Sequence, residues 1–389
     1  MKYLMTISLF LANFISLFSA NNLPFEIVKN PSATNSLASN LFSFGDSFGF
    51  SWIERGINGD SRFYMASWNG LKFDEKCLVA TSNKMFTNWA DIPSVIETNS
   101  GDLYAHWLKR ISSKTYAYGV QIVRSTNRGK SWNPVGWLHK DISDTEHGFV
   151  SLIPEDQHVR AFWLDGRSMK SPNGKMMLRT AVINEEQIKD ETILDNDVCT
   201  CCPTSAIQQP NGPIVVYRDR SSRDIRDISF ILGRGDKWSE PATVHADNWL
   251  MPGCPVNGPS IAFSKDLIAV SRYTVVQNKS QVILRLSKDK NINSGKDIIL
   301  DNNAPIGRCV TVCYKDSIFT IWIGFHENET VLKIAEVSSI AEIIRSLPIT
   351  KVNANRSSGI PRAITSGGYL WLSWTDSNRI SIGRLKIGG

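Results

Sequence analysis

The sequence has no long run of lysine and arginine, and charge of neither sign dominates it. Its 389 residues include 43 basic and 37 acidic side chains, for a formal net charge of +6 at pH 7. Nucleic-acid-binding domains concentrate basic side chains on one face or stripe, so we expect no nucleic-acid partner. Long stretches rich in Ala, Glu, Lys and Leu are absent as well, which argues against coiled coils and helical repeats.

After residue 20 the sequence also lacks any apolar run long enough to cross a membrane. Residues 1–20 read MKYLMTISLFLANFISLFSA, with Lys2 ahead of an apolar run and small residues at its end. This arrangement is typical of a cleaved signal peptide, and the run is shorter than the ~20 residues of a membrane span. We therefore predict a signal peptide over 1–20, a single domain over 21–389, and a secreted or periplasmic protein with no membrane span.

One pattern occurs seven times along the chain: a short apolar strand, a polar turn, and a second strand that closes with an aromatic residue. A unit of roughly 50 residues with four short antiparallel strands is a propeller blade. The pattern thus predicts an all-β fold, a closed β-propeller of seven four-stranded blades. Aligned anchor positions in the first strands are Ser43, Ser94, Ser151, Ser205, Ser260, Thr311 and Arg362, and the closing aromatics are Trp52, Trp107, Trp163, Tyr217, Tyr273, Trp322 and Trp374.

The last copy leaves room for only three strands before the C-terminus. We expect the N-terminal segment PFEIVKN (24–30) to supply the missing outer strand and to close the ring, because closure removes exposed sheet edges. We also expect the protein to be a monomer.

Residues 125–132 read STNRGKSW, which resembles the Asp-box pattern S-x-D-x-G-x-[ST]-W with Asn127 in the aspartate position. Further stretches, among them NWADIPS, EHGFVSLIP, CCPTSAI and GCPVNGPS, resemble exported bacterial sialidase-like proteins from about residue 40 to the end. The chain is thus similar to the sialidase superfamily with its BNR/Asp-box repeat. The resemblance implies a propeller, with six blades as the alternative to seven, and a glycan or glycoconjugate as partner.

Sialidases bind sialic acid through arginines, one of them in an R-I-P motif, and use a Tyr–Glu pair with an aspartate acid/base. The corresponding segment here reads DIPS, with Asp91 in the place of that arginine. An aspartate repels a carboxylate that a guanidinium would bind in bidentate fashion. The resemblance therefore implies a glycoside hydrolase architecture without the sialic acid clamp.

Charged residues gather before the first strand and after the second strand of many repeats. Because neighbouring strands are antiparallel, these positions meet at one end of the ring. Paired carboxylates among arginines suit glycosidic acid–base chemistry, so we predict Asp91, Glu146 and Asp219 as catalytic. A structural ion-pair network between blades is the alternative. The predicted substrate-binding residues are Arg218, Arg220, Asn257, Arg308 and Arg362.

Three of the seven cysteines lie within four residues. Cys199, Cys201 and Cys202 occur in DVCTCCPTS before the fourth repeat, and Cys254 precedes the fifth repeat at the same end. Closely spaced thiols bind soft metals such as copper(I) or zinc. Exported proteins also form disulfides, for example with Cys254. Both interpretations stay open on the sequence, which indicates no other cofactor.

Three functions fit these observations. The first is an exported, sialidase-like and exo-acting glycoside hydrolase that uses carboxylates and arginines at the end of the channel. The second is a non-catalytic propeller that binds a glycan or a protein, and the third is a metal-binding propeller built on the cysteines. Propellers host all three functions. We expect a glycan-directed protein and, if it is an enzyme, a glycoside hydrolase.

Overall fold

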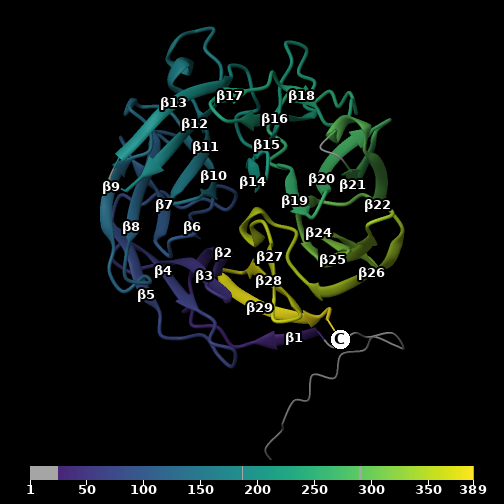
Figure 1. The fold of residues 1–389 in the computed structure, drawn as a ribbon, viewed down its shortest axis with the longest axis horizontal. Coiled ribbons are helices and arrows are strands. Elements are labelled where there is room, and N and C mark those ends of the chain that lie inside the picture. The colour runs from purple at the N-terminus through teal and green to yellow at the C-terminus, as the bar shows by residue number, and fades with distance from the viewer. Residues whose placement is uncertain (1–24, 186, 289–290, 389) are drawn as a thin grey trace, which may run out of the picture.

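The computed structural model describes residues 25–185, 187–288 and 291–388, and its strands form seven antiparallel sheets arranged in a ring (Figure 1). The predicted signal peptide lies outside these residues. Helical structure within them consists of three short 3₁₀ turns, Arg167–Lys170, Ile292–Ser294 and Arg356–Ser358. No helix in the described ranges is long and apolar enough to cross a membrane.

Each sheet is one blade, with its first strand beside the channel and its last strand at the rim (Figure 1). The first three blades each use four consecutive strands. Blade 1 is β2 (Ser36–Phe44), β3 (Ser47–Arg55), β4 (Ser61–Ser67) and β5 (Cys77–Ser82); blade 2 is β6 (Ser94–Glu97), β7 (Leu103–Arg110), β8 (Tyr118–Ser125) and β9 (Asn133–Trp137); blade 3 is β10 (His147–Glu155), β11 (His158–Asp165), β12 (Met177–Asn184) and β13 (Gln187–Asp195).

The next three blades follow the same plan. In blade 4 the outer strand is split, because both β17 and β18 pair with β16. Blade 4 is β14 (Ser205–Gln209), β15 (Gly212–Arg218), β16 (Ile228–Arg234), β17 (Lys237–Trp238) and β18 (Ala242–Thr243); blade 5 is β19 (Ser260–Ser264), β20 (Leu267–Val276), β21 (Lys279–Lys288) and β22 (Lys296–Asp301); blade 6 is β23 (Gly307–Tyr314), β24 (Ser317–His326), β25 (Glu329–Ser338) and β26 (Ile343–Lys351).

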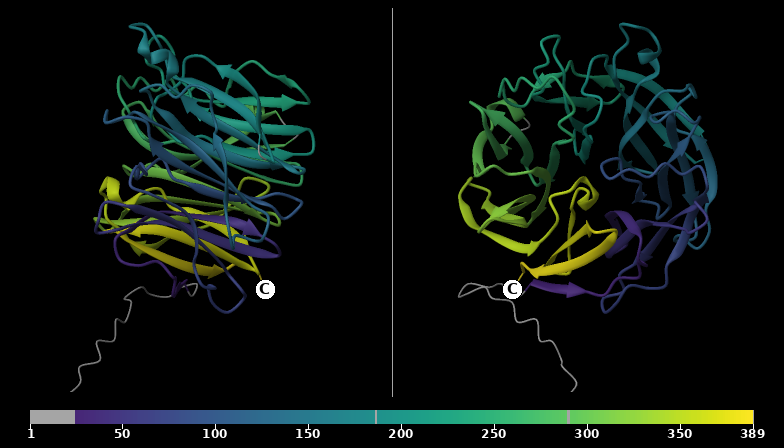
Figure 2. Two further views of the ribbon diagram at one scale, coloured as in Figure 1. Left: turned by 90° about the vertical axis from the view of Figure 1, so that its left-hand side faces the viewer. Right: turned by 180° about the vertical axis from the view of Figure 1, so that it is seen from behind.

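Blade 7 joins the two ends of the chain. It contains β27 (Arg362–Ser366), β28 (Tyr369–Asp376), β29 (Arg379–Lys386) and, as its outermost strand, β1 (Phe25–Val28). Strand β1 pairs with β29 in register from Phe25 opposite Leu385 to Val28 opposite Ile382, and Figure 2 shows it beside β29 at the rim. The predicted N-terminal closing strand is therefore confirmed, as are seven blades in place of six.

Hydroxyl groups at the anchor positions join neighbouring blades. The Ser205 hydroxyl accepts a hydrogen bond from the Ile261 amide at 3.2 Å, and the Ser260 hydroxyl accepts one from the Thr311 amide at 2.9 Å.

The predicted anchor of the first blade, Ser43, is displaced from the position that the other anchors occupy. Ser94, Ser151, Ser205 and Arg362 each pair with the residue before their closing aromatic, whereas Ser43 pairs with Phe48, four residues before Trp52. Asn40, opposite Ser51, holds the equivalent place after a bulge in β2.

Four of the closing aromatics, Trp52, Trp163, Tyr217 and Trp322, direct their polar tips to carboxylates. The Trp163 indole donates to Asp165 at 2.8 Å, and the Trp322 indole donates to Asp301 at 2.7 Å. A buried indole requires such an acceptor. Aromatic–carboxylate pairs of this kind explain much of the acidic content near the strand ends.

Residues 125–132 form the turn between β8 and β9, at the outer side of blade 2, where the resemblance places it. Asn127 takes the aspartate role in this turn, because its side-chain oxygen accepts the Ser131 amide at 3.0 Å. The Ser125 hydroxyl accepts the Gly129 amide at 2.9 Å. Such side-chain bonds to nearby amides stabilise tight turns.

Candidate functional site

The first strands begin, and the second strands end, at one face of the ring, which we call the mouth. Asp91 lies just before β6, Glu146 just before β10, and Tyr118 at the start of β8. The Tyr118 hydroxyl contacts Asp91 Oδ2 at 3.1 Å and Glu146 Oε1 at 2.6 Å. The structure thus brings together two of the three predicted catalytic carboxyl groups around a tyrosine that the sequence did not single out.

These groups are deeply buried. Asp91 is 1% exposed and Tyr118 is fully buried, whereas Glu146 keeps partial exposure at the mouth. Burial raises the pKa of Asp91 to about 7 and that of Glu146 to about 7. Burial, together with the two neighbouring carboxyl groups, raises the Tyr118 pKa well above its usual value of 10.0. The phenol therefore stays protonated at neutral pH.

A phenol has one hydrogen to donate, so it cannot donate to both carboxyl groups at once. The 2.6 Å contact with Glu146 has the length of a charge-assisted O–H···O⁻ bond. The longer contact with Asp91 is a hydrogen bond if Asp91 is protonated and donates to the phenol oxygen. Asp91 Oδ1 also accepts the Phe149 amide at 2.8 Å. The geometry therefore indicates that Asp91 and Glu146 share one proton in addition to the phenol hydrogen.

Asp219, the third predicted catalytic residue, belongs to a different group. It accepts the Ser229 hydroxyl at 2.9 Å and the Arg220 amide at 2.6 Å. Burial, followed by repulsion from Asp195, raises the Asp219 pKa to about 6. Asp195 in turn accepts the Tyr217 hydroxyl at 2.6 Å. Among the described residues, no hydrogen bond or ion pair links Asp219 to the Asp91 and Glu146 group, so the structure does not support a three-carboxylate site.

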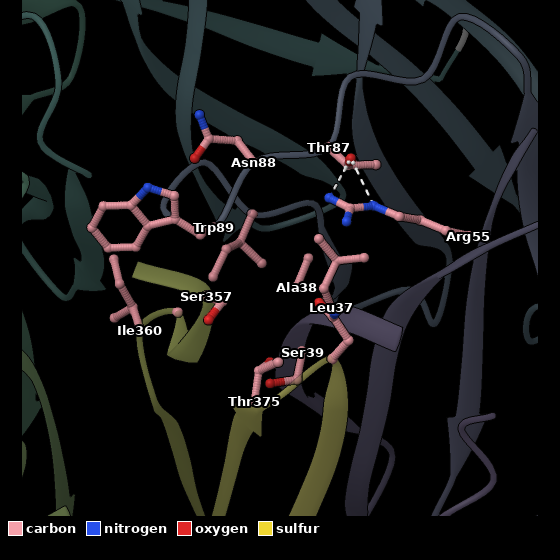
Figure 3. A pocket seen from close by; sticks show the side chains of 13 residues that line it. Leu37, Ala38, Ser39, Arg55, Thr87, Asn88, Trp89, Ser357, Ile360 and Thr375 are labelled. Atoms are coloured by element: carbon pink, nitrogen blue, oxygen red, sulfur yellow. Dashed lines mark hydrogen bonds between the residues drawn. The ribbon is translucent and has the colours of Figure 1, made fainter. Parts of the chain in front are cut away.

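A pocket of about 330 Å³ opens at the mouth between blade 1, blade 7 and the loop before β6 (Figure 3). The Arg55 guanidinium crosses one side of it and donates to the Thr87 hydroxyl at 3.3 and 3.0 Å. None of the lining residues is acidic. The polar side chains of the lining are those of Ser39, Arg55, Thr87, Asn88, Ser357, Thr375 and Asn378, and the larger apolar ones are Leu37, Trp89, Ile92 and Ile360.

Arg308 does not line this pocket but contacts two residues that do, Trp89 and Gly359. Its guanidinium lies 4.6 Å from the centroid of the Trp89 ring and donates to the main-chain oxygens of Asn355 and Gly359 at 3.1 and 3.0 Å. Burial lowers the Arg308 pKa to about 10. Arg308 therefore supports Trp89 and the segment before β27. It is not placed to bind a ligand directly.

Arg218 and Asn257 are structural in this arrangement. Arg218 is 2% exposed and donates to the main-chain oxygens of Asn257 and Tyr273, both at 2.8 Å, and to that of Arg226. The Asn257 side chain accepts the Arg308 amide at 2.6 Å. All these donors and acceptors are used within the protein, so the predicted substrate contacts of Arg218 and Asn257 find no support.

The other two predicted arginines differ from each other. Arg220 donates to Asp224 at 2.9 Å in a partly exposed pair, so these two charges of the loop after β15 neutralise each other. Arg362 begins β27 beside the channel, and burial lowers its pKa to about 10. Its Nε is buried and has no hydrogen-bond partner among the residues that the structure describes. Of the predicted arginines in the described residues, Arg362 is thus the one with a fully buried donor that lacks a partner.

The cysteines before β14 form a compact group. The sulfur of Cys199 lies 3.9 Å from that of Cys201 and 3.6 Å from that of Cys202. An S–S bond is about 2.05 Å long, and all seven cysteines of the chain are free thiols here. The structure thus shows clustered thiols and not the disulfide. Hydrogen bonds from Cys201 and Cys202 lower the Cys199 pKa.

Comparisons with known proteins support the ring architecture. No protein-family model matches the chain, and no curated protein matches it in sequence. Many solved structures do match. The Fusarium graminearum α-L-arabinofuranosidase Arb93A is 12% identical with a TM-score of 0.53, covering 94% of this chain and 98% of its own. The Penicillium chrysogenum α-L-arabinanase, solved with arabinobiose, is 11% identical with a TM-score of 0.52, covering 93% and 98%.

The likeness extends to propellers of other kinds. The β-propeller domain of the Trilobed protease from Pyrococcus furiosus is 9% identical, with a TM-score of 0.51 over 90% of this chain and 95% of its own. A Trypanosoma rangeli sialidase superposes with a TM-score of 0.47 at 9% identity, covering 82% and 56%. What these proteins share is the propeller. At such identities the likeness shows the fold alone, and membership of the sialidase superfamily stays a prediction.

Proposed function

We propose that this protein is an exported, glycan-directed β-propeller that binds one or two sugar rings in the pocket between blade 1, blade 7 and the loop before β6. The pocket itself carries the proposal. Its lining combines hydroxyl, amide and guanidinium groups with the Trp89 indole and has no carboxylate (Figure 3). About 330 Å³ lies at the lower end of the range for ligand pockets, which suits a small polyhydroxylated ligand.

Arg55 is an exposed charged group of this pocket that can reorient toward a ligand. Within the described residues, its guanidinium donates hydrogen bonds only to the Thr87 hydroxyl, which is neutral. Donors without an ionic partner bind sugar hydroxyls at little electrostatic cost. Trp89, supported from behind by Arg308, offers an apolar surface for a sugar ring. The arabinobiose in the Penicillium neighbour supports arabino-oligosaccharides as probes.

Glycoside hydrolysis is the second candidate, favoured by the Asp91, Tyr118 and Glu146 group. Burial raises the pKa of Glu146 to about 7, so this one carboxyl group can serve as a general acid or base near neutral pH. Glu146 keeps partial exposure at the mouth, so it is the member able to meet a substrate. Asp91 and Tyr118 act through it, because both are buried. Direct contact of Asp91 with a sugar is not part of this proposal.

Binding is tested by titrating the mature protein with neutral and uronic-acid-containing oligosaccharides of two to four units. We expect at least one to bind, and Arg55→Ala to weaken binding about tenfold or more. Arg128→Ala is the matched control, because Arg128 is an exposed arginine at the opposite end of the same blades. Equal saccharide affinities of Arg55→Ala and Arg128→Ala would show that the saccharide does not bind in this pocket.

Hydrolysis is tested separately, by measuring reducing ends released from the saccharide that binds best. If the second candidate is right, Glu146→Gln lowers turnover by about 10²–10⁴-fold, the usual contribution of acid–base catalysis, while the saccharide still binds. Binding without release in the unaltered protein would leave the glycan-binding function standing and rule out the hydrolase for that sugar.

A further inference from the structure

The cysteine group before β14 has the spacing of metal ligands. The three sulfurs of Cys199, Cys201 and Cys202 all lie within 4.8 Å of one another. Zinc–sulfur bonds are about 2.3 Å long in tetrahedral sites, so two sulfurs on one ion lie about 3.8 Å apart. The two closest pairs, at 3.6 and 3.9 Å, bracket this separation. We propose that these cysteines bind one soft cation, copper(I) or zinc(II), independently of the saccharide pocket.

The chain holds the three thiols in place before any ion arrives. Cys199 and Cys202 are each 1% exposed, and Cys201 is partly exposed, so the group has a buried base and an open side. The Cys199 amide donates to the Arg218 main-chain oxygen at 3.1 Å, which fixes the segment against the end of β15. Thiolates in a compact, fixed arrangement need little reorganisation to bind a metal.

A buried guanidinium supplies the charge that such a site needs. Arg226 is 5% exposed, and its Nη1 donates to the Cys199 sulfur at 3.1 Å. Its Nε is buried without a hydrogen-bond partner in the described residues. Three thiolates carry more negative charge than one monovalent or divalent cation cancels, and an adjacent arginine offsets part of the excess. Arg226 is therefore a positioning residue for the site.

A fourth ligand is available on the open side. Cys254 is exposed in the segment before β19, and its sulfur lies 3.6 Å from the hydroxyl of Thr200, the residue between Cys199 and Cys201. The two segments pack tightly, since a Cβ on Gly258 would lie 2.1 Å from the Pro203 oxygen. A metal bound to this group would therefore link the segment before blade 4 to that before blade 5.

The test uses full-length mature protein without a histidine tag, reduced under anaerobic conditions. Copper(I) is titrated against bathocuproine disulfonate and zinc(II) against a chromogenic chelator, so that the two arms identify the ion. We expect one equivalent to bind, with near-ultraviolet thiolate-to-metal absorbance. X-ray absorption of the loaded protein should show at least three sulfur ligands at about 2.3 Å, a result that depends on no variant.

Cys201→Ser is the milder ligand variant because Cys201 is partly exposed, and Cys77→Ser on the outer strand of blade 1 is its control. Arg226→Gln should weaken metal binding about 10–100-fold, the usual effect of losing a group that supports a metal ligand. Cys201→Ser removes a ligand itself, so it should weaken metal binding by more than this. Cys77→Ser should bind as the unaltered protein does. The proposal is overturned by equal affinities for Cys201→Ser and Cys77→Ser, by a metal bound through nitrogen or oxygen alone, or by a disulfide within the group in protein isolated from an export host.

Discussion

The hydroxyl of Tyr118 lies 2.6 Å from Glu146 and connects that carboxylate to the buried Asp91. Since one phenol hydrogen serves two carboxyl groups, a second proton must be present for both contacts to be hydrogen bonds. Burial raises the pKa of both carboxyl groups to about 7, so the pair retains this proton well above the pH at which a free carboxyl group loses it. The distribution of protons in this group has consequences for stability that can be measured.

Asp91→Asn should change how stability depends on pH. The Asp91 pKa is raised from its usual 3.8 to about 7, so the folded state retains a proton that the unfolded state has lost between those values. Stability of the unaltered protein therefore falls in that window, by up to about 1.4 kcal/mol per pH unit from this group. The stability of Asp91→Asn relative to the unaltered protein should rise from pH 4 to 7 in urea unfolding. A difference that is flat or falls across this window would contradict the protonated state.

Tyr118→Phe should destabilise the protein by about 1–3 kcal/mol, because it leaves the buried Asp91 and the partly exposed Glu146 without their shared hydroxyl. Tyr116→Phe is the control on the same segment. Tyr116 is 60% exposed, so its substitution should stay within about 0.5 kcal/mol. Urea midpoints for the two variants give the comparison, and similar small losses in both would show that the Tyr118 contacts contribute little.

Arg218→Gln should be far more damaging than Arg220→Gln. The first removes the donors to three buried main-chain oxygens and should cost about 3 kcal/mol or more. The second removes an exposed loop pair with Asp224, which contributes about 0–1 kcal/mol. Thermal unfolding of both variants tests the structural role that we assign to Arg218. Loss of saccharide binding in a fully stable Arg218→Gln protein would instead return this residue to the ligand site.

Phe25→Ala tests the closure of the ring. The Phe25 ring lies 6.1 Å from that of Trp374 and anchors β1 on the outer edge of blade 7. We expect a loss of about 1–3 kcal/mol, less than for a fully buried phenylalanine because Phe25 is partly exposed. We also expect more aggregation, because the β29 edge becomes available. Glu26→Gln, which removes only an exposed pair with Arg384, should have little effect. Equal stability of both variants would mean that β1 is dispensable.

The sequence predicted the ring well because its signals are local and repeated. Alternation of apolar and polar residues, turn residues and the closing aromatics recur along the chain. The last repeat has only three strands, so the N-terminal segment was the available candidate for its fourth strand. The first-blade anchor was misplaced at Ser43, three residues past Asn40, which is the residue that pairs beside the closing aromatic. The bulge before Asn40 is not the cause, because β10 has a bulge at the same place, between Gly148 and Ser151.

The candidate site was predicted only in part. Strand order placed Asp91, Glu146 and the cysteines at one face, since all precede first strands. Which side chains meet there depends on rotamers and loop paths, and sequence does not show these. Tyr118 was missed because its partners are 27 and 28 residues away. Arg218 and Arg308 seemed suited to ligands, yet their donors serve main-chain oxygens, which sequence gives no means to foresee.

The most direct test of the glycan-directed function is a crystal structure of the protein soaked with the saccharide that binds best in solution. The account predicts sugar density in the pocket that holds Arg55 and Trp89. Density only in the groove at the opposite end, between Trp68 and Tyr369, would contradict it. The absence of sugar density from both the pocket and the groove at a saturating saccharide concentration would contradict it as well.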